Sequence, residues 1–348
     1  MNLRFVQKSC GLDIGQRALR LIQLKKGRGL PTIISSGEIK VPDGVIKNGK
    51  IEKIDEFVSL VKKLLKKVRG KKISTKYVNA CLPGPNTFIV LIKLTYPESK
   101  NILEEILNEA KKHIPYPLEN TYLDWQYVDE KDKSKVLISI CPKDIVDNYQ
   151  QALAKAGLIA TALEIEVATI CRSLIEMNER QEEPIMIMDL GATRTSVTAY
   201  QNQTILFSIS LSFSSDNLTN ELEKKLNLSH AEAKKAKKTC GLDLKKAGGG
   251  VRKILEPLVD NLATQIREAR YFYHEHFFKD KQINNLLLTG GGSNLIGLAE
   301  FLSEKSRITV KLADPAVNIN KANQALLESD IQSYTTAIGL ALRKNSVQ

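Results

Sequence analysis

Runs of apolar residues that end in tight turns predict a chain that mixes β-strands with helices. Two stretches each begin as a buried strand and turn back into a second strand, CGLDIGQRALRLIQL at 10–24 and IMIMDLGATRTSVTAY at 185–200. A third stretch, NNLLLTGGGSNLIGLAEFL at 284–302, predicts a buried strand, a glycine loop and a helix capped by Ser293 or Asn294. All three stretches place glycine where a buried strand ends.

The segments between these stretches predict further strands and amphipathic helices. The predicted strands lie at 32–41, 77–84, 122–128, 135–141, 159–165 and 204–213, and the predicted helices at 52–69, 98–113, 143–156 and 167–179. Another helix is expected from Pro257 to about Phe278, with the proline in its first turn. The alternation of strands and helices predicts an α/β protein.

The length of the chain predicts two lobes. A chain of 348 residues exceeds the size at which one hydrophobic core usually keeps growing. The polar stretch NERQEEP at 178–184 predicts the boundary, with a first lobe at 1–180 and a second at 181–348. The order strand–helix–strand–strand–helix–strand predicts a small subdomain inserted into the first lobe at about 88–162.

Composition indicates a soluble globular protein of the cytoplasm. Hydrophobic residues make up 43% of the chain and charged residues 26%. No run reaches the roughly 18 apolar residues that cross a bilayer, and the first ten residues lack the apolar core of a signal peptide. The five cysteines are widely spaced, so they are expected to be reduced core residues, and no metal site is predicted from protein ligands alone.

The net charge of +12 indicates an anionic partner or surface. The densest cationic run, KKLLKKVRGKK at 62–72, follows a helical face and has two interpretations. It is either a solvated helix surface or a surface attracted to an acidic membrane. Nucleic acid is not expected as a partner, because no basic segment is interleaved with aromatic residues and no helix-turn-helix signature is present.

Two carboxylates predict a site for a magnesium-bound nucleotide. Asp13 and Asp189 each end a buried strand, and Gly15 and Gly191 follow two residues later. A glycine lets the backbone approach an anion, and exposed N–H groups in such turns bind phosphate. A carboxylate beside phosphates is explained by hydrated Mg²⁺, which prefers carboxylates, waters and phosphate oxygens. The two hairpins are therefore predicted to hold one nucleotide from opposite sides.

The order GLDIG, MDLGATRTS and LTGGGSNLIGL resembles the two phosphate motifs and the adenosine motif of the actin-like ATPase superfamily. The resemblance implies a two-lobed actin-like fold, a duplicated ribonuclease H-like architecture, with a subdomain of the second lobe at about 215–285. It also implies ATP and Mg²⁺ as cofactors. Glu166, with Glu164 as the alternative, matches the acidic residue that orders Mg²⁺ and the attacking water in relatives.

The resemblance assigns roles to named residues. Asp13 and Asp189 would hold Mg²⁺ through water, and Glu166 and Asp189 would be catalytic. The implied nucleotide contacts are Asp13, Gly15, Gln16, Arg17, Arg20, Gly191, Ala192, Thr193, Glu221, Lys224, Gly290, Gly291, Gly292 and Ser293. Gln16 and Arg17 depart from the superfamily pattern, which often has Ser or Thr there, so the first loop is expected to bind through its backbone and Arg20 or Arg17.

The segment HIPYP at 113–117, the inserted subdomain and the ending AIGLALR together resemble the PilM family of type IV pilus assembly proteins, which is related to FtsA. This resemblance implies an ATP-binding scaffold at the inner face of the cytoplasmic membrane, with at most weak ATPase activity. It implies an N-terminal peptide of a PilN-like membrane protein as partner, bound in a groove that includes Ile114, Pro115 and Tyr116. The pilus assembly platform and its motor ATPase are further implied partners.

Two alternatives from other functional classes remain open. A small-molecule kinase of the same fold would need a carboxylate base in a substrate cleft, and the sequence offers no obvious one. An FtsA-like, filament-forming division protein would be expected to end in an amphipathic membrane helix. The ending AIGLALRKNSVQ is too short and too weakly basic and apolar for that role.

Overall fold

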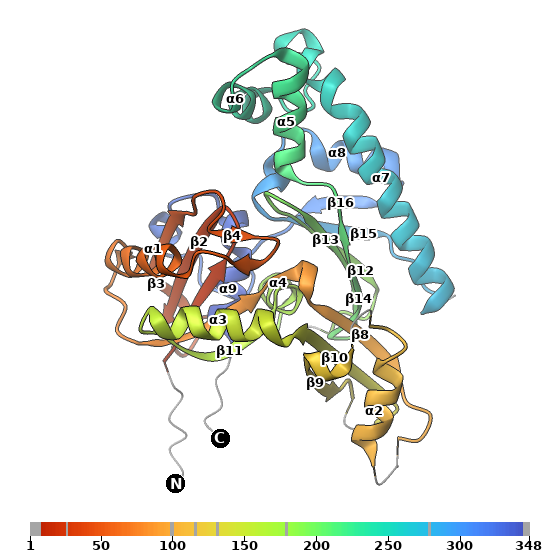
Figure 1. Cartoon of the computed structure of the whole chain (residues 1–348). Coiled ribbons are helices and arrows are strands. Elements are labelled where there is room, and N and C mark those ends of the chain that lie inside the picture. The colour runs from red at the N-terminus through yellow and green to blue at the C-terminus, as the bar shows by residue number, and fades with distance from the viewer. Residues whose placement is uncertain are drawn as a thin grey trace. The chain divides into compact units, whose positions relative to one another are not determined.

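The computed structural model describes residues 8–25, 27–97, 101–114, 117–129, 132–177, 180–277 and 280–343. These residues form two compact units, whose elements are labelled in Figure 1. Unit 1 comprises the described parts of Met1–Glu179 and Pro315–Gln348, and unit 2 those of Arg180–Asp314. The segment from Pro315 onward, which the sequence analysis assigns to the second lobe, therefore packs in unit 1.

The main sheet of unit 1 has the strand order β11-β7-β1-β2-β3-β6. Strand β1 pairs antiparallel with β2 and parallel with β7, which in turn pairs parallel with β11. The strands are β1 (Cys10–Ile14), β2 (Ala18–Lys25), β3 (Thr32–Lys40), β6 (Arg69–Gly70), β7 (Tyr77–Leu82) and β11 (Ile159–Ile165), and a separate hairpin joins β4 (Ile46–Lys47) to β5 (Lys50–Ile51).

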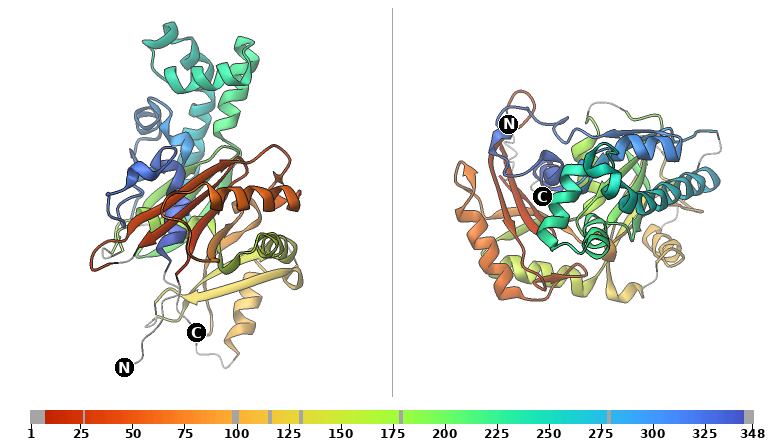
Figure 2. Two further views of the ribbon diagram at one scale, coloured as in Figure 1. Left: turned by 90° about the vertical axis from the view of Figure 1, so that its left-hand side faces the viewer. Right: turned by 90° about the horizontal axis from the view of Figure 1, so that it is seen from above.

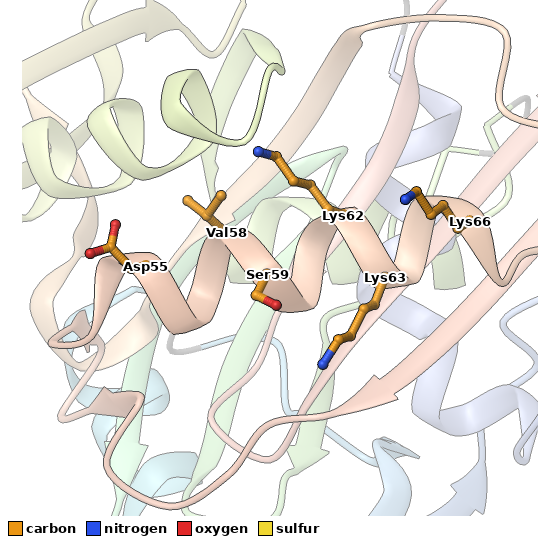
Figure 3. A pocket seen from close by; sticks show the side chains of 6 residues that line it. All are labelled: Asp55, Val58, Ser59, Lys62, Lys63 and Lys66. Carbon is orange, nitrogen blue, oxygen red and sulfur yellow. The ribbon is translucent and has the colours of Figure 1, made fainter.

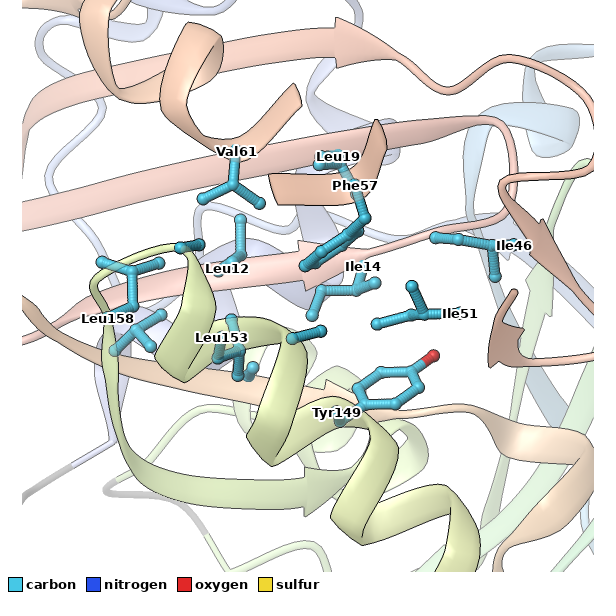
Figure 4. Packing of buried hydrophobic residues seen from close by; sticks show 14 of the residues in the cluster. Leu12, Ile14, Leu19, Ile46, Ile51, Phe57, Val61, Tyr149, Leu153 and Leu158 are labelled. Atoms are coloured by element: carbon cyan, nitrogen blue, oxygen red, sulfur yellow. The ribbon is translucent and has the colours of Figure 1, made fainter. Parts of the chain in front are cut away.

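Helices α1 (Ile54–Lys66) and α3 (Lys143–Lys155) pack against one face of this sheet. Leu12 of β1 and Leu19 of β2 meet Phe57 of α1 there, and all three side chains are completely buried (Figure 4). The apolar side chains of both helices recur at helical spacing, so each helix turns one stripe to the sheet. This layer is the main hydrophobic core of unit 1.

Helices α4 (Glu166–Leu174) and α9 (Thr335–Leu342) lie on the opposite face, to which Gly11 of β1 points because strand residues alternate. A Cβ atom on Gly11 would lie 2.3 Å from the carbonyl oxygen of Ala337, and one on Gly339 would lie 1.9 Å from that of Thr169. Every residue of α9 is buried. Two glycines thus admit an apolar helix between β1 and α4, which explains why the C-terminal segment belongs to unit 1.

A subdomain with its own core follows β7 in unit 1. It contains β8 (Phe88–Lys93), α2 (Ile102–Ala110), β9 (Thr121–Tyr127) and β10 (Lys135–Pro142), with strand order β8-β10-β9 and antiparallel pairing. Ile92, Ile106 and Ile138 form its centre. The subdomain predicted from the sequence extends to about 162, but α3 and β11 pack into the main core and sheet instead.

Unit 2 repeats the strand pattern of unit 1. Its strands follow the order β16-β15-β12-β13-β14, with β12 antiparallel to β13 and parallel to β15. This order matches β11-β7-β1-β2-β3, strand for strand and direction for direction. The strands are β12 (Ile185–Leu190), β13 (Thr195–Gln201), β14 (Thr204–Leu211), β15 (Asn285–Thr289) and β16 (Thr309–Leu312). The predicted duplicated actin-like α/β fold is confirmed.

The helices of unit 2 are α5 (Ser215–Leu226), α6 (His230–Cys240), α7 (Gly250–His276) and α8 (Leu298–Ser306), and Figure 2 shows the first two beside α7. Two predictions for them were wrong. Helix α7 begins at Gly250, so Pro257 lies inside it and not in the first turn. Helix α8 has Gly297 as its N-cap, because a 3-10 turn at Gly291–Asn294 follows the glycine loop.

A buried lysine joins α6 to the start of α5. Lys237 is 8% exposed, and its Nζ donates to the carbonyl oxygen of Ser215 and to the hydroxyls of Ser215 and Thr219, the two hydroxyl contacts being 2.7 Å long. Burial lowers the pKa of Lys237 to about 8. An ammonium group is thus fully bonded but poorly hydrated at the N-terminal turn of a helix, where the dipole disfavours positive charge.

None of the helices in the described residues is long and apolar enough to span a membrane.

Gly339→Ala is expected to destabilise the protein, because the added methyl group would overlap the carbonyl group of Thr169. Overpacking of this kind costs about 1–3 kcal/mol, which lowers the thermal midpoint by several degrees. Gly250→Ala is the matched control, since a Cβ on that helical glycine meets nothing within 4 Å. Equal midpoints for the two variants would contradict the close crossing of α4 and α9.

Lys237 is expected to make unfolding depend on pH. Because its folded pKa of about 8 lies below the usual 10.5, the unfolded chain binds more protons between these values, and stability rises with pH across that window by up to about 3 kcal/mol. Denaturant titrations from pH 7 to 10 should show this rise in the wild type relative to Lys237→Met. Lys234→Met, an exposed change on the same helix, should keep the wild-type slope.

Candidate functional site

The hairpins β1–β2 and β12–β13 contain the same turn. The N–H of Gly15 donates to the carbonyl oxygen of Ala18 at 3.1 Å, and that of Gly191 to Arg194 at 2.9 Å. A Cβ atom on either glycine would lie 2.9 Å from that same oxygen. Glycine is therefore required by the close approach of the two backbone segments, and only two residues remain at each tip.

In unit 1 the carboxylate of Asp13 lies beside a thiol and a guanidinium group. Asp13 is 7% exposed, and its Oδ1 accepts a hydrogen bond from the Cys81 thiol at 3.5 Å. Its Oδ2 lies 3.8 Å from Nη1 of Arg20, whose Nη2 donates to Oε1 of Glu38 at 3.2 Å. The structure thus holds Arg20 between two carboxylates, beside the turn rather than at its tip.

Glu166 lies close to this carboxylate. Strands β1, β7 and β11 are parallel, so Asp13, Cys81 and Glu166 come from strand ends at the same edge of the sheet. Burial raises the pKa of the Cys81 thiol, and the negative charges of Asp13 and Glu166 raise it further. In open α/β sheets, ligands bind at this edge, the carboxyl ends of the parallel strands.

The neighbouring carboxylate, Glu164, has a structural role. It is 8% exposed and accepts two hydrogen bonds from Arg172, at 2.7 and 3.0 Å, as well as an ion pair from Arg343. Arg172 also donates to the carbonyl oxygen of Gly339 in α9 at 2.9 Å. Because Glu164 is occupied in this way, Glu166 is the better candidate for a ligand-facing acid.

The two tip residues of the first turn differ in their surroundings. Arg17 is exposed and forms an ion pair with the carboxylate of Asp43. Gln16 is half-buried. Neither residue supplies a hydroxyl group, so the first turn offers backbone N–H groups and cationic or amide side chains to an anion.

In unit 2 the glycine loop packs directly on the second hairpin. A Cβ atom on Gly290 would lie 2.3 Å from Oδ1 of Asp189, and one on Gly292 would lie 1.9 Å from Cδ2 of Leu190. Gly290 also has a φ of +84°. These two glycines are required by close packing, and they bring the loop against the carboxylate that the sequence analysis singled out.

The remaining residues of this loop have different environments. Gly291 is exposed. Ser293 is 6% exposed, and its hydroxyl donates to the carbonyl oxygen of Gly290 at 2.7 Å. Ser293 therefore stabilises the loop, while Gly291 is the part of it open to a ligand.

The second turn presents an anion-binding surface. The N–H groups of Ser215 and Asp216 donate to the carbonyl oxygens of Gly191 and Ala192, at 3.1 and 2.8 Å, which fastens the turn to the start of α5. In the part of the chain that the structure describes, the N–H groups of Ala192 and Thr193 donate no hydrogen bond. Two adjacent free N–H groups and the exposed Thr193 hydroxyl suit phosphate oxygens.

Glu221 and Lys224 lie further along α5. Glu221 is half-buried and faces Lys225, whose Nζ lies 3.9 Å from its Oε1. Lys224 is exposed. Both therefore stand on the helix whose first turn is fastened to the second hairpin.

Three residues at these sites were not predicted from the sequence. Cys81 was read only as core, and Arg172 was not singled out. Lys237 belongs to a lysine-rich run, in which its composition does not distinguish it from its neighbours. The available signal is its spacing, because it follows the buried Ala233 by four residues and so lies on the same helix face.

The predicted partner groove and the predicted magnesium site concern Ile114 to Tyr116 and the two turn carboxylates. Ile114 is half-buried against the core of the inserted subdomain, while Pro115 and Tyr116 lie outside the described residues. Among the residues that are described, no group of three His, Cys, Asp or Glu side chains could hold a metal ion. A Mg²⁺ ion at Asp13 or Asp189 would therefore need ligands from a nucleotide and water, which fits the carboxylate of Asp189 beside the free N–H groups of Ala192 and Thr193.

Solved structures similar to this chain share its fold. A PilM–PilN type IV pilus biogenesis complex contains a chain that matches with a TM-score of 0.83 and 22% identity, over 97% of this chain and 98% of that one. MreB5 of Spiroplasma citri bound to ADP matches with a TM-score of 0.54 and 11% identity, over 96% and 94% of the two chains.

Sequence comparisons identify the family. The cell division protein FtsA of Streptococcus pneumoniae serotype 2 is 22% identical over 88% of this chain and 75% of its own length. The model of the family described as type IV pilus assembly protein PilM matches residues 11–345. This chain belongs to the PilM family of type IV pilus assembly proteins.

Proposed function

We propose that this chain is an ATP-binding scaffold of the type IV pilus inner-membrane assembly platform, at the inner face of the cytoplasmic membrane. It binds ATP with Mg²⁺ and the N-terminal cytoplasmic peptide of a PilN-like membrane protein. The platform and its motor ATPase are further partners. Family membership supports the pilus role, and MreB5 with ADP is a precedent for a nucleotide on this fold.

One observation supports nucleotide binding above the others. Each unit presents a carboxylate two residues before a glycine whose backbone closes the same two-residue turn. The turn in unit 2 offers two free N–H groups, an exposed hydroxyl and a glycine loop beside Asp189. This set matches the needs of phosphate oxygens and of a hydrated cation bound to them.

Each residue has a role in this proposal. Phosphate oxygens are bound by Gly15, Gly191, Ala192 and Thr193. The first turn also contacts the nucleotide through Gln16, Arg17 and Arg20. Gly290, Gly291, Gly292 and Ser293 form the adenosine-binding loop, with Glu221 and Lys224 as contacts to ribose or adenine. Asp13 and Asp189 hold the hydration shell of Mg²⁺, which would offset the phosphate charge and order water.

Hydrolysis in this proposal is slow. Glu166, in the first turn of α4, would orient a water molecule near the phosphates. Fast hydrolysis also needs a general base whose pKa matches the working pH, and the sequence offers no evident one. The same reasoning disfavours a small-molecule kinase, since none of the described residues forms an evident base for an acceptor hydroxyl.

The partner peptide is proposed to bind beside the inserted subdomain, with Ile114, Pro115 and Tyr116 in the groove. This subdomain exposes three large apolar side chains, Tyr96, Leu103 and Tyr122, by 71%, 50% and 49%. The Tyr122 hydroxyl donates to Oδ1 of Asp147 in α3 at 3.2 Å, so this residue lies where the subdomain meets the main core. Exposed aromatic side chains at such junctions are frequent anchors of bound peptides.

Asp189→Asn is expected to weaken binding of ATP with Mg²⁺ at least tenfold, because the amide holds the hydration shell of the cation less strongly. In EDTA the same variant should bind ATP as well as the wild type or better, since a charge that repels phosphate is gone. Isothermal titration calorimetry with and without Mg²⁺ measures both effects. Asp147→Asn on α3 is the control, and equal losses with and without Mg²⁺ would contradict a metal role for Asp189.

Tyr122→Ala is expected to weaken binding of the PilN-like peptide about 5- to 30-fold, the usual effect of removing an aromatic anchor. Fluorescence anisotropy with the labelled peptide measures the change. Tyr271→Ala is the control, because Tyr271 is a tyrosine of similar exposure, 68%, on α7 of unit 2 and is not part of the inserted subdomain. If both variants bind the peptide with wild-type affinity, the groove does not include β9.

A further inference from the structure

The outer side of α1 and the segment after it form an exposed cationic surface. Six lysines, all exposed, make up this surface, which we call the lysine face: Lys62, Lys63, Lys66, Lys67, Lys71 and Lys72. At 100° per residue, Lys62, Lys63 and Lys66 lie opposite the buried Phe57, Val61 and Leu64, and Lys67, the C-cap residue, lies at the side of the helix. The face is therefore the solvent side of a helix whose other side is fixed in the core.

Acidic residues are sparse along this part of the chain. The sequence has no Asp or Glu from Phe57 to Pro97. None of the six ammonium groups has an ion-pair partner among the described residues. The nearest acids along α1 are in its first turn, where Glu56 pairs with Lys53 at 3.1 Å, and Asp55 lies two helical turns before Lys62. Along the helix a residue rises about 1.5 Å, so Lys62, Lys63 and Lys66 follow one another within about one Debye length and act together on an anionic surface.

Helix stabilisation accounts for only part of this charge. Lys63 and Lys66 stand in the last turn of α1, where cations favour the helix dipole. Lys71 and Lys72 lie beyond the helix, and the backbone of Lys71 is fixed by donation from its N–H to the carbonyl oxygen of Ile34 at 2.9 Å. The helix dipole therefore does not explain the positive charge of Lys71 and Lys72.

The shape of the face suits a broad and mobile partner. A shallow hollow of about 440 Å³ runs along α1 between Asp55 and Lys66, and Figure 3 shows the lysine side chains fanning out around it. The arginine nearest the face, Arg69, is turned back, with Nη1 donating to the carbonyl oxygen of Leu327 at 3.4 Å. Flexible lysines are point charges without fixed geometry, whereas arginine forks recognise single phosphates.

The composition of the face favours lipid over nucleic acid. The aromatic residue of α1, Phe57, is completely buried, so the helix offers no ring for stacking on bases. Clusters of four to eight lysines and arginines are typical of surfaces that bind anionic lipids. We propose that the lysine face docks unit 1 onto an anionic phospholipid membrane. This contact goes beyond the proposed function, since it needs neither ATP nor a protein partner.

Vesicle co-sedimentation of the full chain tests this contact directly. The probes are vesicles of phosphatidylcholine with about 30% phosphatidylglycerol, and vesicles of phosphatidylcholine alone, at about 50 mM and 500 mM salt. The wild type is expected to sediment only with the anionic vesicles at low salt. Changing Lys62, Lys63 and Lys66 to Gln should lower the partition coefficient about 100-fold, since each lysine near the surface contributes about fivefold.

Helix α6 supplies a control with the same chemistry and spacing. Lys234, Lys235 and Lys238 are exposed and stand in the same i, i+1, i+4 pattern, so changing them to Gln removes the same charge. This variant should keep wild-type sedimentation. Both triple variants should keep the circular dichroism spectrum and the ATP affinity of the wild type, which separates a failure here from a failure of the proposed function.

Several outcomes overturn the assignment. If both triple variants lose vesicle binding to the same extent, binding depends on net charge and not on the lysine face. If the wild type binds neutral vesicles, or binds anionic vesicles at high salt, lysines do not drive membrane binding. Absence of wild-type sedimentation at low salt would remove the membrane contact altogether. Affinity for a DNA duplex that only the α1 substitutions abolish, without vesicle binding, would assign the face to nucleic acid instead.

Discussion

The close approach of a glycine to a carbonyl oxygen in each hairpin is the constraint on which the site depends. The oxygens of Ala18 and Arg194 leave no room for a side chain on Gly15 and Gly191. Each turn is therefore limited to two tip residues, and the carboxylate two positions before the glycine stays at the strand end. Because the same constraint occurs in both units, the duplicated fold presents a carboxylate beside the same turn twice, with different tip residues.

Neighbouring acids in unit 1 have separate tasks. Glu164 joins Arg172 and Arg343, and Arg172 reaches the carbonyl oxygen of Gly339, so this buried network fastens α9 to α4 and β11. Breaking one partner of such a network leaves an uncompensated charge, which makes it poorly suited to exchange ligands. Glu166, two residues later, begins a helix and is half-exposed. The end of β11 thus carries an acid with a structural role, and the start of α4 carries the half-exposed Glu166.

The features that could be predicted from the sequence are those that depend on a few neighbouring residues. The turns at Gly15 and Gly191, the family and the duplicated α/β fold followed from short motifs whose chemistry is contained in a few residues. The location of the C-terminal helix did not, because α9 is apolar on all sides and its own pattern names no neighbour. The glycines that admit it, Gly11 and Gly339, are separated by most of the chain, and only the structure shows the backbones that they approach.

Lysine runs show why composition alone cannot assign a surface. The runs KKLLKK on α1 and KKAKK on α6 have similar charge, yet in α6 the register turns Lys237 inward to three oxygen atoms, while in α1 every lysine of the run is exposed. The difference follows from the partner residues, since α1 buries Phe57, Val61 and Leu64 and keeps its cations opposite them. The buried apolar stripe of a helix therefore determines which of its lysines are exposed. In α1 the stripe is complete, so all four lysines of the run remain on the solvent side, where an external partner can reach them.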